Sequence, residues 1–84
     1  MGKSRSEGFV ANVVAILERE RRSQGMSHEK LAGEAGVHRS TVSRTERGLM
    51  NPTLYVLHAM ASALKLRLSE VADEAEERDR RGGK

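Results

Sequence analysis

The apolar residues in the first quarter of the chain recur at helical spacing. One stripe of the helical surface takes in Val10, Val13 (or Val14), Leu17 and Arg21, with Phe9 and Ile16 at its edge. Gly25 follows this stripe at the position where a glycine commonly ends a helix. The pattern therefore predicts a first helix over about residues 8–24, preceded by a flexible polar tail over residues 1–7.

A second, short helix is expected between Ser27, a good N-cap, and Gly36, which adopts a positive φ at little cost. Its apolar residues are Leu31, Ala32 and Ala35. A helix of about eight residues is not stable alone, so it must pack directly against a neighbour. Because Ala32 is small, the next helix can cross it closely.

A third helix, from His38 or Arg39 to Arg47, is almost entirely polar. Val42 is its one clearly apolar residue, so most of its surface is left to solvent or to a partner. The residues expected on its outer face are Arg39, Ser40, Ser43 and Arg44. Two short helices joined at a glycine turn, with a polar second helix, match a helix-turn-helix that reads DNA.

Two more helices are expected after the loop over residues 49–52. Thr53 caps the fourth helix, whose inward stripe is Leu54, Leu57, Ala61 and Leu64. The fifth runs from about Leu68 to Arg80, with Val71 and Ala75 inward, and residues 79–84 are expected to be a flexible tail. The chain is therefore predicted to be all-α, with one compact five-helix domain over residues 8–78.

Composition narrows the chemistry. The absence of Cys excludes disulfides, thiolate zinc sites and cysteine nucleophiles, and no two of the three His residues have the spacing of metal ligands on a helix. Nothing resembles a nucleophile elbow, a carboxylate pair or a glycine-rich phosphate loop, so we expect no enzyme, no metal and no cofactor. The net charge of +3 permits a polyanionic partner without requiring one.

The beginning of the chain imitates a targeting signal. Lys3 and Arg5 precede the largely apolar run 9–17. The chain then continues with five charged residues over 18–22, where a signal peptide has small residues and a cleavage site. The run is also too short to span a bilayer. We therefore expect a cytoplasmic protein without a membrane partner.

Several different short motifs lie one after another in the middle of the chain. They are Met26-Ser27, Glu29-Lys30-Leu31-Ala32, Gly36-Val37, Ser40-Thr41-Val42-Ser43, Glu46-Arg47-Gly48 and Asn51-Pro52. Together they resemble the Cro/CI-repressor (XRE-like) helix-turn-helix family, over roughly residues 10–72. The resemblance implies a repressor-like transcriptional regulator that binds double-stranded DNA. It would act as a homodimer on a pseudo-palindromic operator, with the third helix in the major groove.

The resemblance also implies roles for individual residues. Base contacts fall to Arg39, Ser40, Ser43 and Arg44, which favours guanine in the half-site. Phosphate contacts fall to Ser27, His28, Thr41, Arg47 and Thr53. A structural ion pair is expected between Arg21 and Glu46. Four residues depart from the family pattern. His28 replaces a Gln, so DNA affinity is expected to fall as pH rises, and Thr45 replaces a bulky apolar residue. Lys65 replaces a common Gly and Arg67 a common capping Ser, between the fourth and fifth helices.

The apolar residues near the C-terminus have two interpretations, as core or as a dimer seam. We expect a seam formed by Tyr55, Met60, Leu66, Leu68 and Val71. Small members of the family include restriction–modification controllers, phage repressors and antitoxins, and the length of the chain fits all three. The alternative function is therefore that of an antitoxin, or another interaction module that mainly binds a partner protein.

Overall fold

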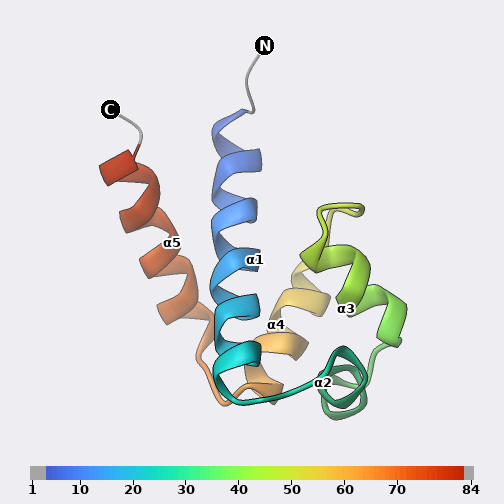
Figure 1. Ribbon diagram of the computed structural model, residues 1–84. Helices are drawn as coiled ribbons and strands as arrows, with labels where there is room; N and C mark the ends of the chain where they lie inside the picture. The colour runs from blue at the N-terminus through green and yellow to red at the C-terminus, as the bar shows by residue number, and fades with distance from the viewer. Residues whose placement is uncertain (1–3, 83–84) are drawn as a thin grey trace.

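Five α-helices make up the chain in this computed structural model, which describes residues 4–82 (Figure 1). They are α1 (Arg5–Ser23), α2 (His28–Ala35), α3 (Arg39–Glu46), α4 (Leu54–Ala63) and α5 (Leu68–Gly82). No strand occurs within residues 4–82, so the predicted all-α, five-helix fold is confirmed. α1 and α5 pack along one another, whereas α2, α3 and α4 gather on the other side of α1 (Figure 1).

α1 begins earlier than the apolar stripe predicted. Its N-cap is Ser4, whose hydroxyl accepts a hydrogen bond from the backbone N–H of Glu7 at 3.1 Å. The Glu7 carboxylate in turn accepts from the Ser4 backbone N–H at 2.9 Å, which completes a capping box. Residues 4–7 of the expected tail are therefore ordered by local hydrogen bonds, and residues 1–3 lie outside the described residues.

α5 also extends further than expected, because it continues to Gly82. The side chain of Asp79 lies 3.8 Å from Arg5 at the start of α1, and Arg80 pairs with Glu77 one turn earlier at 3.2 Å. The expected tail over residues 79–84 is thus helical through residue 82. Residues 83 and 84 lie outside the described part of the chain.

The core lies where α1 and α4 meet the α2–α3 pair, and α5 packs against α1 and α4. Its fully buried large side chains are Val13, Ile16, Leu17, Leu31, Val42, Thr45, Met60 and Leu64. Leu54, which the periodicity placed inward, is instead 73% exposed, because the stripe on α4 is covered only from Leu57 onward.

The burial of two residues corrects the expected dimer seam. Met60 is 0% and Val71 is 4% exposed, because α5 folds over α1 and α4 and encloses both side chains within their own chain. A partner subunit has no access to either residue. Of the other expected seam residues, Leu66 and Leu68 are half-buried against the core, and Tyr55 is 71% exposed.

Thr45 lies at the centre of the contact between α3 and the core. Its side chain is fully buried, yet its hydroxyl oxygen has no hydrogen-bond partner within residues 4–82. A buried hydroxyl without a partner loses its hydrogen bonds to water and gains none from the protein. Thr45 therefore packs α3 against the core but leaves its own hydroxyl without a hydrogen bond.

Replacing Thr45 by Val is expected to stabilise the protein by about 1 kcal/mol, because Val keeps the shape and removes the unsatisfied hydroxyl. The midpoint of urea unfolding measures this change. Thr53→Val is the matched control: the Thr53 hydroxyl accepts from the backbone N–H of Val56 at 3.1 Å. Its loss removes a helix cap and is expected to destabilise the protein by about 1 kcal/mol. A Thr45→Val variant that is less stable than the unaltered protein contradicts this account of Thr45.

Candidate nucleic-acid interface

The α2–α3 pair is built by local capping and a left-handed glycine. The Ser27 hydroxyl accepts from the backbone N–H of Lys30 at 3.0 Å and caps α2. Gly36 ends α2 with φ 73° and ψ 31°, a conformation that costs a residue with a Cβ extra energy. Leu31 and Ala32 on the inner face of α2 are 0% and 2% exposed, so α2 is anchored in the core on one side.

α3 is held by a narrow inner face and presents the rest of its surface outward. Val42 and Thr45 are its two buried residues. Of the four polar residues predicted for the outer face, Arg39, Ser40 and Arg44 are exposed and Ser43 is half-buried. Arg39 and Arg44 are therefore not covered by another segment of residues 4–82.

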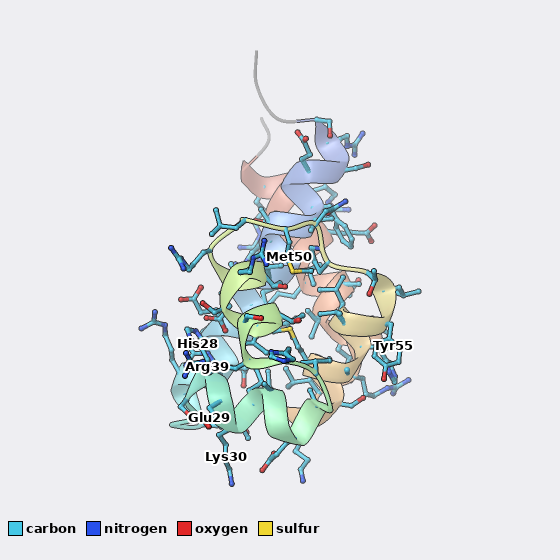
Figure 2. The ribbon with its side chains drawn as sticks, turned by 90° about the vertical axis from the view of Figure 1, so that its right-hand side faces the viewer. His28, Glu29, Lys30, Arg39, Met50 and Tyr55 are labelled. Atoms are coloured by element: carbon cyan, nitrogen blue, oxygen red, sulfur yellow. The ribbon has the colours of Figure 1, made fainter. Side chains whose placement is uncertain are left out.

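The amino end of α2 and the outer face of α3 form one concave surface. It is lined by Ser27, His28, Glu29, Arg39, Ser40, Ser43, Arg44 and Arg47. Figure 2 looks onto this side of the molecule and shows His28, Glu29 and Arg39 along it. Of the residues predicted to contact DNA, Thr41 and Thr53 are the two that do not line this concavity: Thr41 is half-buried on α3 and Thr53 caps α4.

The concavity is electropositive. Arg39, Arg44 and Arg47 form no ion pair within residues 4–82. Among the residues that line the concavity, Glu29 carries the one carboxylate. Several arginines elsewhere are paired with carboxylates: Arg19, for example, lies 2.8 Å from Glu74 across the α1–α5 contact. Three unpaired guanidinium groups on one face attract a polyanion.

A buried ion pair joins α1 to the end of α3. Arg21 donates to the two oxygens of the Glu46 carboxylate, from Nε at 2.7 Å and from Nη2 at 3.0 Å. Its third nitrogen donates to the backbone carbonyl of Met26 at 2.6 Å. His28 Nε2 lies 2.9 Å from the Glu46 Oε1 atom, so three elements of the chain meet at one carboxylate.

The environment of Glu46 keeps it ionised. Burial of the carboxylate alone would raise its pKa, but the hydrogen bonds from Arg21 and His28 outweigh burial, and the pKa of Glu46 is lowered. The same hydrogen bond to Glu46 raises the pKa of Arg21. The pair is therefore fully charged near neutral pH, and it orients α3 relative to α1.

A helix-turn-helix family profile matches residues 17–71, which is more than half of the chain. This chain belongs to the helix-turn-helix family. The match confirms the predicted resemblance to Cro/CI-repressor (XRE-like) proteins. An uncharacterized HTH-type transcriptional regulator from Methanothermobacter thermautotrophicus is 35% identical over 49 residues, which are 58% of this chain and 71% of that protein.

Two features are absent from the described residues. Within residues 4–82, no group of three or more His, Asp or Glu side chains is arranged to hold a metal ion. None of the helices described there combines the length and apolarity needed to cross a membrane.

Sequence reasoning missed the contact between His28 and Glu46. It assigned His28 to phosphate and Glu46 to Arg21, and the two residues are 18 positions apart in the chain. No local pattern links them, because the contact exists only where the amino end of α2 meets the carboxyl end of α3. His28 thus has a second role, as a donor to the buried carboxylate.

Removing one partner of the ion pair is expected to be costly. Glu46→Gln leaves the guanidinium of Arg21 buried without a counter-charge, which destabilises the protein by about 3–5 kcal/mol. The double variant Arg21→Met, Glu46→Met removes both charges and is expected to recover most of that loss. Urea unfolding of the two variants measures both effects, and a double variant that is no more stable than Glu46→Gln contradicts the argument.

Proposed function

We propose that this protein is a sequence-specific, double-stranded DNA-binding transcriptional regulator. The observation that carries the proposal is the outward face of α3, where Arg39, Ser40 and Arg44 are exposed beside Ser43. An α-helix fits the major groove of B-DNA, and exposed Arg side chains form bidentate contacts with guanine. The HTH-type transcriptional regulator similar to this chain supports the same function.

Base and phosphate contacts divide between the concavity and two residues outside it, Thr41 and Thr53. Arg39, Ser40, Ser43 and Arg44 on α3 contact base edges. Ser27 and His28 at the amino end of α2 contact a phosphate on one side, where the first backbone N–H groups of the helix also point. Arg47, Thr41 and Thr53 contact phosphates on the other side and so set the position of α3 in the groove.

The protein acts as a homodimer on a pseudo-palindromic site. Two recognition helices related by a two-fold axis bind half-sites one DNA turn apart, about 34 Å. The surface available for pairing includes Tyr55, the half-buried Leu66 and Leu68, and two further exposed apolar residues, Leu49 and Leu54. Tyr55 is labelled in Figure 2, on the same side of the molecule as α3.

A selection of random DNA duplexes by the purified protein, read by sequencing, tests the function directly. We expect an enriched palindromic motif that contains guanine, with half-sites about one helical turn apart. Failure to enrich any sequence above the input pool contradicts sequence-specific DNA binding.

Arg44→Ala is expected to reduce operator affinity by about 1–3 kcal/mol and to relax specificity at one base position. Titration of the selected duplex and of its single-base variants measures both effects. Arg80→Ala, an exposed Arg at the far end of α5, is the matched control and is expected to leave affinity unchanged. An equal loss of affinity on operator and on random DNA would show that Arg44 contacts phosphate instead of a base.

Tyr55→Asp is expected to shift the protein toward monomers and thereby to weaken operator binding. The side chain is 71% exposed, so a charge there opposes pairing without disturbing the core. Sedimentation velocity measures the change in mass, and Tyr55→Phe, which keeps the apolar ring, is expected to remain dimeric. An unchanged profile for Tyr55→Asp places the dimer interface elsewhere.

The exposed apolar residues favour one alternative function, an antitoxin or another module that mainly binds a partner protein. Leu49, Leu54 and Tyr55 are each more than half exposed and lie close together in the chain. Salt distinguishes the two functions, because each phosphate contact adds about 0.9 to the log–log slope of affinity against salt. A complex held through apolar side chains loses little affinity in moderate salt.

A further inference from the structure

We propose that His28 couples DNA binding to the uptake of a proton, because its imidazole can donate to a DNA phosphate only when it is protonated. The inference rests on the proposed function, since DNA supplies the phosphate. It specifies how the binding surface responds to pH and which atom is responsible.

The first step concerns the nitrogen that faces the protein. Glu46 is ionised and its side chain is only 4% exposed, so its carboxylate can accept hydrogen bonds but cannot donate them. His28 Nε2 lies 2.9 Å from Glu46 Oε1. The hydrogen of that bond must therefore belong to Nε2 in both the neutral and the charged imidazole.

The second step concerns the nitrogen that remains. In a neutral imidazole with its hydrogen on Nε2, Nδ1 carries a lone pair and acts as an acceptor. Within residues 4–82, Nδ1 of His28 has no hydrogen-bond partner, and 37% of the side chain is exposed. A phosphate oxygen is also an acceptor, so it is repelled by the lone pair of Nδ1 and attracted by the N–H of the imidazolium.

The third step is the charge that surrounds the ring. Arg21 of α1 pairs with Glu46 at the end of α3, and Glu29 of α2 is next to His28 in the chain. α3 contributes Arg39 and Arg44 to the concavity, and Arg47 follows α3 as its C-cap. No titratable residue of α4 or α5 in the described chain lines this concavity.

The bound phosphate sets the sign of the effect. A bound phosphate adds negative charge and favours the proton, so the complex holds more protons than the free protein, and affinity falls as pH rises.

The experiment measures affinity for the selected operator between about pH 5.5 and pH 8 at fixed ionic strength, a range in which histidine changes charge. We expect affinity to fall by up to about tenfold per pH unit for each His28 that takes up one proton. Calorimetry in buffers of different ionisation enthalpy is expected to show proton uptake on binding.

His28→Gln is the decisive variant. Its amide NH2 group can donate one hydrogen to Glu46 and the other to a phosphate, and it does not titrate. Its operator affinity is therefore expected to be independent of pH over this range. His58→Gln, on the exposed side of α4, is the matched control and is expected to keep the pH dependence of the unaltered protein.

The outcomes separate this inference from the proposed function. If the protein binds no duplex at any pH, the proposed function fails and the inference fails with it. If it binds an operator without proton uptake, or if His28→Gln keeps the slope, the inference alone is overturned. If His38→Gln loses the pH dependence of affinity and His28→Gln keeps it, the coupling belongs to His38, and the inference for His28 is overturned. The inference is also overturned if NMR nitrogen shifts of the free protein show that the neutral imidazole of His28 carries its hydrogen on Nδ1.

Discussion

The orientation of α3 depends on the nearly enclosed carboxylate of Glu46. It accepts hydrogen bonds from Arg21 on α1 and from His28 at the start of α2, while Arg21 also holds the backbone at Met26. An ionised group with so little exposure is tolerated only because its partners compensate for the lost hydration. The same compensation specifies one arrangement of the three elements, since any rotation of α3 would separate charges that are buried.

This polar connection matters because the apolar contact of α3 is small. Val42 and Thr45 are the two buried residues of α3, and the hydroxyl of Thr45 has no partner in the described chain. A short helix with so little buried surface is not held firmly by packing alone. The helix that presents the arginines is thus oriented by a buried ion pair, and the exposed side chains of its outer face do not contribute to that ion pair.

Ion pairs are also distributed differently along the α1–α5 contact and on the outer face of α3. Along the α1–α5 contact, basic and acidic side chains pair with each other, as Arg19 does with Glu74 and Arg5 with Asp79. On α3, the arginines form no ion pair within residues 4–82 and retain their full charge toward solvent. The face of α3 therefore carries arginines that form no ion pair in the described chain, and a polyanion would bind there.

The sequence by itself determined the five helices, the glycine turn and the outward face of α3. These features depend on local chemistry: Ser27 is a cap, Gly36 accepts a positive φ, and a helix with one clear apolar residue must expose most of its surface. The Arg21–Glu46 pair was anticipated through a family resemblance, because the two residues are 25 positions apart and no local rule connects them.

Only the tertiary structure decided which surfaces the helices cover and which distant groups meet. Periodicity placed Leu54 inward and left Met60 off the stripe for a dimer seam, yet Leu54 is exposed and Met60 is buried. Val71 was expected both inward and in the seam, and it is buried. A helical stripe shows which residues share a face, but the packing of the neighbouring helices decides how much of that face is enclosed. The contact of His28 with Glu46 arises for the same reason, since it needs the end of one helix to lie against the beginning of another.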